Sequence, residues 1–339
     1  MHTERGDDMK ARIALLYGGA GSEHDVSVMG YQYVTELLKD SDYEILPVYV
    51  DKTGEWLIRI KGADTPTYPT RNMGGSLYTG YGFIKIDAAI PLLHGDGGED
   101  GSVQGALEIA DIPCVGAGVC ASAVCLDKTY AKAVAESLGI PTVSSVTFSR
   151  VTDTEVALAA CRERLDFPMF IKPRRLGSSV GAYPARDEVE FRYAFPRAMY
   201  EGENLVIVER MLTDKRELEC AFCEMNGEEI ITPPGEVLVE GFYGYGEKYG
   251  GKTRTAAIAD VTDSIREEIS VYSRALADAL GLRHLARIDY FLSEGRLYFN
   301  EVNTFPGFTG ESLYPKMLKA NGIDPACALI SFVEDALDC

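Results

Sequence analysis

The sequence predicts an α/β protein of three domains, with α+β character in its C-terminal part. Its 339 residues suffice for two or three domains, because a typical domain has about 100–200 residues. Hydrophobic residues make up 46% of the chain and charged residues 25%, which is typical of globular proteins with well-filled cores. The chain starts with a strand, a glycine turn and a helix, whereas long strands follow one another after Asn204. These patterns predict an open parallel sheet first and a hairpin-rich domain last.

The first predicted domain covers residues 1–118. A buried strand at 12–17 ends in Gly18-Gly19, and an amphipathic helix follows at 26–39. Further strands at 44–50 and 87–93 extend the open parallel sheet. Residues 55–82 carry no clear pattern, and their length predicts an insertion between strands.

Two further domains follow in the remaining sequence. The second, residues 119–205, is a smaller α/β block with predicted helices at 119–126, 128–138, 153–163 and 187–200 and strands at 145–148 and 168–172. The third, residues 206–339, has predicted strands at 205–209, 217–224 and 228–232, a helix at 262–280, a hairpin at 285–303 and a last helix at 325–337. The glycine- and tyrosine-rich segment 240–255 is predicted to be a mobile lid, and an ordinary surface loop is the alternative.

Charge and hydropathy exclude two kinds of partner. The chain has 33 Lys and Arg against 52 Asp and Glu, a net charge of −19, which disfavours binding to nucleic acid. No run of about 18 apolar residues occurs and the N-terminus has no signal-peptide pattern, so we expect no membrane association and a cytoplasmic location. Cys220 and Cys223 form a CxxC on a predicted strand, where they face opposite sides, so we expect reduced core thiols and no soft-metal site.

Acidic and amide side chains gather on the predicted hairpin at 285–303. Glu301 and Asn303 share one face of their strand, and pairing residues whose numbers sum to about 590 would place Asp289 opposite Glu301. Two carboxylates and an amide oxygen suit Mg²⁺ shared with phosphates. The alternative is a solvated hairpin face that carries ordinary charges.

Two lysines precede features that suit phosphate groups. Lys172 ends an apolar strand and is followed by a loop with Gly177, Ser178 and Ser179, which offers a positive charge, hydroxyls and backbone N–H groups. Lys128, at the start of a predicted helix, is a second phosphate candidate. From the strand ends we also expect Glu209 to bind a purine edge and Glu217 to bind a ribose.

The glycine turn at the N-terminus does not match a dinucleotide-binding fingerprint. The GxGxxG spacing would require glycine where His24 stands, which weakens the hypothesis of a nicotinamide cofactor. Glu23 lies at a helix start, where it is either a helix cap or an anchor for the amino group of a ligand.

Taken in order, these motifs resemble the D-alanine–D-alanine ligases of the ATP-grasp superfamily. The resemblance spans residues 12 to about 320 and rests on Gly18–Ser27, Leu93–Gly105, the Lys172 loop, Glu247-Lys248-Tyr249, Arg287-Ile288-Asp289 and Asn300–Thr309. It implies a three-domain ATP-grasp fold with ATP between the central and C-terminal domains, and a homodimer. It also implies ligation of two D-alanines through an acylphosphate, for peptidoglycan precursor synthesis.

The resemblance assigns roles residue by residue. It implies two Mg²⁺ ions, with Mn²⁺ as a substitute, held by Asp289, Glu301 and Asn303. It implies ATP binding by Lys128, Lys172, Ser179, Glu209, Met211, Glu217 and Phe299. It implies catalytic roles for Glu23, Ser178, Arg287, Gly307 and Ser312, and substrate binding by His94, Lys248, Tyr249 and Leu313, with Lys248 also near ATP. Arg287 and the Gly307 N–H would form an oxyanion hole, Glu23 would bind the first ammonium, and Ser178 with Tyr249 would link Glu23 to the lid.

The sequence departs from the family pattern at three places. Gly21 stands where the family usually has serine, Gly310-Glu311 is unusual before Ser312, and the segment from Glu209 to Glu217 is one residue longer than in several relatives. A ligase of the same fold with D-serine or D-lactate as acceptor remains open, because an apolar pocket separates a methyl from a hydroxymethyl group by only about 1–3 kcal/mol. An NAD-dependent oxidoreductase and an ATP-binding regulator without turnover also remain open.

Overall fold

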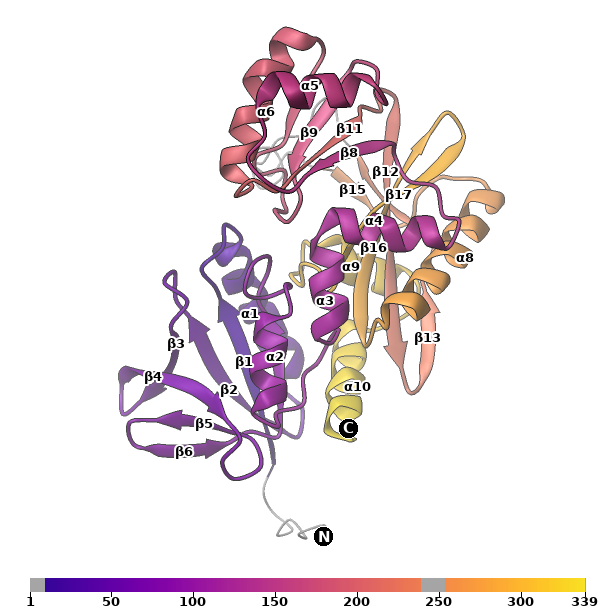
Figure 1. Ribbon diagram of the computed structural model, residues 1–339. Helices are drawn as coiled ribbons and strands as arrows, with labels where there is room; N and C mark the ends of the chain where they lie inside the picture. The colour runs from indigo at the N-terminus through magenta and orange to yellow at the C-terminus, as the bar shows by residue number, and fades with distance from the viewer. Residues whose placement is uncertain (1–9, 239–253, 339) are drawn as a thin grey trace.

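The chain folds around three β-sheets. The computed structural model describes residues 10–238 and 254–338 (Figure 1). A seven-stranded sheet forms the N-terminal part, a four-stranded sheet the central part, and a six-stranded sheet the C-terminal part. The helices and strands predicted in these residues are confirmed, with their ends shifted by one or two residues.

The N-terminal sheet is mixed, with strand order β6-β5-β4-β3-β2-β1-β7. Its elements are β1 (Ala11–Gly18), α1 (His24–Leu38), β2 (Tyr43–Val50), β3 (Trp56–Ile60), β4 (Ala63–Thr70), β5 (Ser76–Thr79), β6 (Gly82–Lys85), β7 (Ala88–Leu92) and α2 (Ser102–Ile109). Only β2, β1 and β7 are parallel.

Residues 55–82, predicted to be an insertion between strands, lie between β2 and β7 in the sequence. These residues form β3 to β6, which continue the sheet as antiparallel neighbours. Tight turns make this possible, since Lys61 (φ 51°) and Gly62 (φ 85°) adopt the left-handed conformation that two-residue hairpins need. β4 was not recognised in the sequence because it contains Pro66 and Pro69, and proline is rare inside strands.

The central sheet has the order β10-β9-β11-β8 and is covered by two helices (Figure 1). Its elements are β8 (Ser145–Phe148), α5 (Thr154–Arg162), β9 (Met169–Pro173), β10 (Tyr183–Ala185), α6 (Glu188–Glu201) and β11 (Val206–Arg210). β11 lies between β9 and β8 and pairs antiparallel with both. The predicted boundary at 205/206 therefore separates β11 from the sheet to which it belongs.

The C-terminal sheet has the order β15-β14-β12-β16-β17, with β13 also paired to β12. Its elements are β12 (Lys215–Met225), β13 (Glu228–Ile231), β14 (Gly235–Leu238), β15 (Arg254–Ala256), α8 (Asp263–Leu280), β16 (Leu285–Ser293), β17 (Arg296–Asn303), α9 (Leu313–Ala320) and α10 (Pro325–Asp338). Two earlier helices, α3 (Val119–Leu126) and α4 (Lys128–Ser137), pack on β17 and α8. α3 and α4 were predicted to belong to the central domain, but they pack in the C-terminal core.

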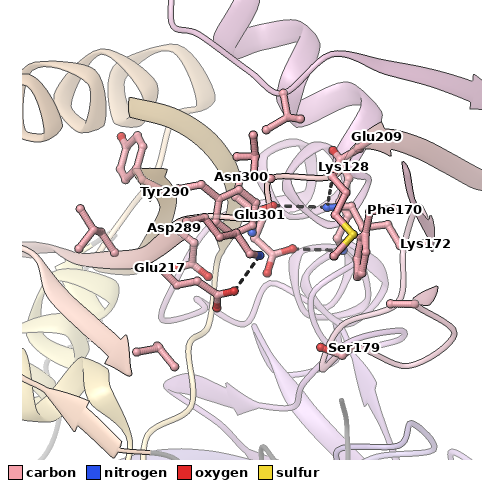
Figure 2. A pocket seen from close by; sticks show the side chains of 18 of the residues that line it. Lys128, Phe170, Lys172, Ser179, Glu209, Glu217, Asp289, Tyr290, Asn300 and Glu301 are labelled. Atoms are coloured by element: carbon pink, nitrogen blue, oxygen red, sulfur yellow. Dashed lines mark hydrogen bonds and ion pairs between the residues drawn. The ribbon is translucent and has the colours of Figure 1, made fainter. Parts of the chain in front are cut away.

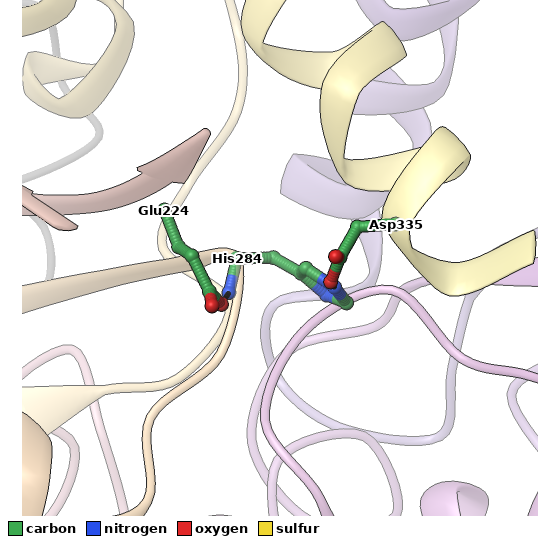
Figure 3. A group of neighbouring side chains, drawn as sticks. All are labelled: Glu224, His284 and Asp335. Carbon is green, nitrogen blue, oxygen red and sulfur yellow. Dashed lines mark hydrogen bonds and ion pairs between the residues drawn. The ribbon is translucent and has the colours of Figure 1, made fainter. Parts of the chain in front are cut away.

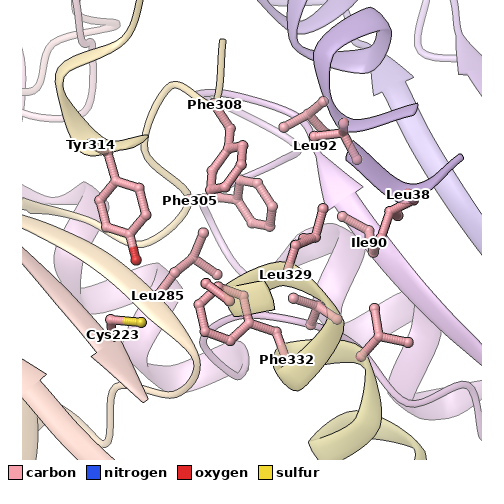
Figure 4. Close-up of a cluster of buried hydrophobic side chains, with 14 of the residues drawn as sticks. Leu38, Ile90, Leu92, Cys223, Leu285, Phe305, Phe308, Tyr314, Leu329 and Phe332 are labelled. Carbon is pink, nitrogen blue, oxygen red and sulfur yellow. The ribbon is translucent and has the colours of Figure 1, made fainter. Parts of the chain in front are cut away.

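One hydrophobic core joins the N-terminal and C-terminal parts (Figure 4). Leu38 and Ile90 from the N-terminal part belong to the same cluster as Leu329 and Phe332 of α10. Cys223 faces this cluster, whereas Cys220 belongs to a second cluster on the other face of β12. The predicted opposite orientation of the two cysteines is thus confirmed, and both are free thiols.

Among the described residues, the helices are all too short or too polar to cross a membrane.

Candidate active site

Two adjoining cavities lie where the three sheets meet. The first cavity, of about 560 Å³, lies between the central sheet and the β16–β17 hairpin. The second cavity, of about 580 Å³, lies between the loops after β1 and β7 and the segment that leads into α9. Lys128, Ser178, Glu219, Arg287 and Glu301 line both cavities, so a group bound in one can reach a group bound in the other.

The hairpin brings together the acidic and amide side chains that the sequence predicted. Asp289 pairs with Glu301 across the two strands, which is the predicted register. The Asn303 Nδ2 atom donates to Asp289 Oδ2 at 3.1 Å, which leaves the amide oxygen of Asn303 for another ligand. Two carboxylates and an amide oxygen are therefore close neighbours, and oxygen donors of this kind fit Mg²⁺.

Two cationic side chains balance the hairpin carboxylates. Arg287 donates to both Asp289 oxygens at 2.8 and 2.7 Å and lies 3.0 Å from Glu219 Oε2, while Lys128 Nζ lies 3.2 Å from Glu301 Oε2. Burial lowers the pKa of Arg287, but Asp289 and Glu219 outweigh burial and hold that pKa well above its ordinary value. The Arg287 guanidinium is thus a permanent charge with a fixed orientation.

The predicted ATP contact through Phe299 is wrong. Phe299 has the same strand parity as Glu301, so an unbroken strand would place both on one face. The register shifts by one after Asp289, which makes Asn300 an extra residue on β17. Asn300 and Glu301 consequently both line the first cavity, whereas Phe299 is 0% exposed and packs against Tyr290 in the core.

Lys172 reaches into the first cavity from the end of β9 (Figure 2). Its Nζ lies 2.8 Å from Glu209 Oε2 and 3.4 Å from Asn300 Oδ1. Lys132, which the sequence analysis missed, pairs with the other Glu209 oxygen and donates to the Val143 carbonyl at 3.0 Å. Its spacing of four from Lys128 on α4 places both lysines on one helix face, and this was the signal available.

The loop after Lys172 connects to the N-terminal part. Ser178 (φ 53°) and Ser179 (φ 59°) adopt the left-handed backbone conformation, which is uncommon for non-glycine residues. Ser178 Oγ donates to Glu23 Oε1 at 2.6 Å. Glu23 makes no side-chain cap bond at the start of α1, so the structure favours the role of an anchor over that of a cap.

His94 presents an unpaired nitrogen to the second cavity. Its Nδ1 lies 3.1 Å from the Phe305 carbonyl oxygen, which can only accept, so Nδ1 carries the proton. The buried Nε2 has no hydrogen-bond partner among the described residues and can accept one from a ligand. The neighbouring Glu99, which the sequence analysis missed, accepts from the Gly95 and Phe305 N–H groups, and burial raises its pKa.

The remaining predicted residues divide between the two cavities. Met211 and Glu217 line the first cavity, and Gly307, Ser312 and Leu313 line the second. Glu217 pairs with Lys215 at 2.8 Å, and the Ser312 hydroxyl accepts from the Thr309 N–H at 3.1 Å. The predicted lid at 240–255 falls almost entirely outside the described residues, and so do Lys248 and Tyr249.

A second group of possible metal ligands lies away from both cavities (Figure 3). His284 Nδ1 accepts from the Gly116 N–H at 2.8 Å, and its Nε2 donates to Asp335 Oδ2 at 2.8 Å. Arg283 pairs with Glu224 and Asp335 and supplies the positive charge. Since both ring nitrogens of His284 are engaged, this group joins three parts of the chain and does not form a metal site.

Comparison with known proteins agrees with this geometry. Residues 12–117 match the family described as D-ala D-ala ligase N-terminus, and residues 134–334 match D-ala D-ala ligase C-terminus. A D-alanine–D-alanine ligase of Solibacter usitatus (strain Ellin6076) is 41% identical over 97% of this chain and 96% of the relative.

Two solved structures are similar over nearly the whole chain. The D-alanyl-alanine synthetase A of Vibrio cholerae O1 biovar eltor str. N16961 has a TM-score of 0.88 at 34% identity, covering 97% of this chain and 99% of the other. The VanG D-Ala:D-Ser ligase of Enterococcus faecalis has a TM-score of 0.87 at 31% identity, covering 97% and 100%. The fold is the predicted ATP-grasp fold. The family match favours a ligase over the NAD-dependent oxidoreductase that the sequence left open. The chain belongs to the D-alanine–D-alanine ligase family.

Proposed function

We propose that this protein uses ATP to join two D-alanines into D-alanyl-D-alanine through an acylphosphate. One observation carries the proposal: a lysine-lined cavity and a cavity with amino-acid-binding groups meet at Arg287 and Glu301. Phosphoryl transfer and amide formation need such an arrangement, because the same carboxylate is first phosphorylated and then attacked.

The reaction balances with the groups that the two substrates bring. A carboxylate oxygen of the first D-alanine attacks the γ-phosphorus, and ADP leaves. The amine of the second D-alanine then attacks the acyl carbon and loses a proton, and inorganic phosphate leaves with one oxygen from the original carboxylate. Phosphorylation is needed because it converts a poor leaving oxygen into a good one.

The first cavity supplies the groups for ATP and its metal ions. Asp289, Glu301 and the free oxygen of Asn303 would hold Mg²⁺, two ions by the resemblance, with Mn²⁺ as a substitute. When bound, the metal neutralises the charge that develops on the transferring phosphoryl group. Lys128 and Lys172 would contact the phosphates.

The second cavity supplies the groups for the two amino acids. Glu23, oriented by Ser178, would bind the ammonium of the first D-alanine. Arg287 and the Gly307 N–H would stabilise the oxyanion of the tetrahedral intermediate. Ser312 and Leu313 would line the acceptor site, and Lys248 and Tyr249 would complete the site from the segment outside the described residues.

D-Serine is the second candidate acceptor, because a solved relative of this fold is named a D-Ala:D-Ser ligase. Leu313, 7% exposed, offers an apolar wall that suits a methyl group better than a hydroxymethyl group. We therefore propose D-alanine as the preferred acceptor. The homodimer expected from the resemblance belongs to this proposal, and light scattering tests it.

Phosphate release from ATP and Mg²⁺ tests the proposal when the products are identified by mass. The reactions contain D-alanine alone, D-alanine with D-serine, D-alanine with D-lactate, or L-alanine. D-alanyl-D-alanine from D-alanine alone, with no product from L-alanine, is the expected result. Binding of ATP without any D-alanine-dependent phosphate would instead support a regulator without turnover.

A further inference from the structure

Three charged side chains form a closed, buried group beside the first cavity. Lys132, Glu209 and Lys172 are 4%, 4% and 8% exposed. Each Glu209 oxygen pairs with one lysine, Oε1 with Lys132 and Oε2 with Lys172 at 2.8 Å. Figure 2 shows Glu209 and Lys172 at the wall of the cavity.

With both lysines protonated, the group carries a net charge of +1. Burial lowers the pKa of Lys132, although attraction to Glu209 opposes this shift. Burial raises the pKa of Glu209, but attraction to Lys132 and Lys172 outweighs burial and lowers that pKa to about 2, so Glu209 is ionised at neutral pH. Two lysines and one carboxylate leave one positive charge over. Without Lys132, Glu209 would pair with Lys172 alone, and the pair would be neutral.

Lys132 differs from its two partners in where it lies. Lys172 and Glu209 line the first cavity, whereas Lys132 does not. Its Nζ donates to the Val143 carbonyl at 3.0 Å and pairs with Glu209. Lys132 can therefore affect a ligand in the cavity only indirectly, through its ion pair with Glu209.

We propose that Lys132 is a positioning residue that shares Glu209 with Lys172 and so leaves the Lys172 ammonium available to the phosphates of the nucleotide. The proposal rests on the proposed function, because it takes a nucleoside phosphate to be the ligand of the first cavity. This role of Glu209 differs from the one expected from the sequence. There Glu209 hydrogen-bonds the purine edge, whereas in the proposal it forms ion pairs with Lys132 and Lys172.

Calorimetric titration of ADP with Mg²⁺ tests the proposal in four proteins: the parent, Lys132→Met, Glu209→Gln, and the double variant. Lys132→Met is expected to bind ADP about tenfold more weakly, because Lys172 becomes locked in a neutral pair. Adding Glu209→Gln removes the negative charge and should strengthen ADP binding relative to Lys132→Met. Lys132→Met leaves the buried Oε1 atom of Glu209 without its lysine donor. The double variant replaces this carboxylate by a neutral amide, so the comparison of the two variants remains possible if Lys132→Met alone folds poorly.

The change in ADP affinity on adding Glu209→Gln to Lys132→Met decides whether Glu209 acts on the two lysines or binds the purine edge. If adding Glu209→Gln to Lys132→Met weakens ADP binding further, or if Lys132→Met binds ADP like the parent, the proposal is overturned. Adenosine, which has no phosphate, should bind to the parent and to Lys132→Met equally well in the same titration. An equal loss of affinity for adenosine and for ADP in Lys132→Met would also overturn the proposal. Failure of the parent to bind ADP would instead refute the proposed function.

Discussion

Glu301 is the residue on which both halves of the proposed reaction depend. It lines both cavities, lies opposite Asp289 and pairs with Lys128 at 3.2 Å. In the proposed function, a carboxylate here would complete the oxygen donors for a metal ion and would hold Lys128, which is proposed to bind phosphate. Removal of its charge should therefore affect catalysis far more than folding.

Glu301→Gln is expected to lower kcat/KM for ATP by about 100-fold or more, because the metal loses a charged ligand. Steady-state phosphate release at several Mg²⁺ concentrations measures the effect. Glu294→Gln is the matched control, since Glu294 is exposed in the turn of the same hairpin. Equal activity of the two variants would contradict the assignment of the metal site.

Ser178 and Ser179 are neighbours with different expected roles. Ser178→Ala removes the 2.6 Å bond to Glu23 and should raise KM for D-alanine by about tenfold with little change in KM for ATP. Ser179→Ala should instead raise KM for ATP, because Ser179 lines only the first cavity. The account would be wrong if both variants changed the same KM.

The sequence predicted the residues whose spacing carries a pattern. Asp289, Glu301 and Asn303 follow strand alternation, and their grouping is confirmed. Lys132 was missed although it lies four residues after Lys128 on the same helix face. Glu99 was missed because its hydrogen-bond partner Phe305 is distant in the sequence, which leaves no periodic signal. Phe299, which the resemblance assigned to ATP, is buried in the core next to a bulge in β17, and the sequence carries no signal of that bulge.

At the scale of elements, the loop between β7 and α2 holds one wall of the second cavity. This loop carries His94 and Glu99 and is fastened to α2 by the Gln104 amide, which donates to the Gly98 carbonyl at 2.7 Å. Gly98 packs directly on the chain at Leu93. A Cβ atom at Gly98 would lie 2.5 Å from the Leu93 carbonyl carbon and oxygen.

Gly98→Ala is expected to destabilise the protein by about 1–3 kcal/mol, because backbone atoms cannot yield to the added methyl group as a flexible side chain would. It should also raise KM for D-alanine by displacing His94 and Glu99. Chemical denaturation and steady-state kinetics measure the two effects. Gly118→Ala is the control, since a Cβ there meets no atom within 4 Å, and equal stability of the two variants would refute the packing argument.

The positions of individual strands and helices along the chain were predicted better than the sheets and cores that they join. The strands and helices that the sequence predicted in the central and C-terminal parts were placed within one or two residues, whereas β10, β14, β15 and α9 were not predicted. The sheet to which β11 belongs and the core that receives α3 and α4 were predicted incorrectly. Local periodicity reports which face of an element is apolar, but it does not report which other apolar face will cover it.

At the scale of the whole molecule, the N-terminal and C-terminal parts are held together by a polar junction as well as a core. His284 accepts from the Gly116 N–H and donates to Asp335 on α10. Burial and the charge of Arg283 lower the pKa of His284 below its ordinary value of 6.5, although Asp335 opposes the shift. The junction therefore requires a neutral imidazole.

This junction predicts how stability depends on pH. Because the pKa of His284 is lower in the folded chain than in the unfolded chain, its contribution is complete above 6.5. The contribution is lost as pH falls below 6.5 toward the folded pKa, since the unfolded chain then binds more protons. His284→Gln should flatten the fall of the unfolding free energy between about pH 7 and 5. An unchanged slope in denaturant titrations across this range would contradict the prediction.

The central claim is that one carboxylate is phosphorylated at the β16–β17 hairpin and then attacked by an amine from the second cavity. Incubation with ATP, Mg²⁺ and D-alanine labelled in its carboxylate with a heavy oxygen isotope tests this claim directly, with both products analysed by mass spectrometry. The account predicts D-alanyl-D-alanine together with inorganic phosphate that carries one labelled oxygen. Unlabelled phosphate, or phosphate released without dipeptide, would contradict the acylphosphate route.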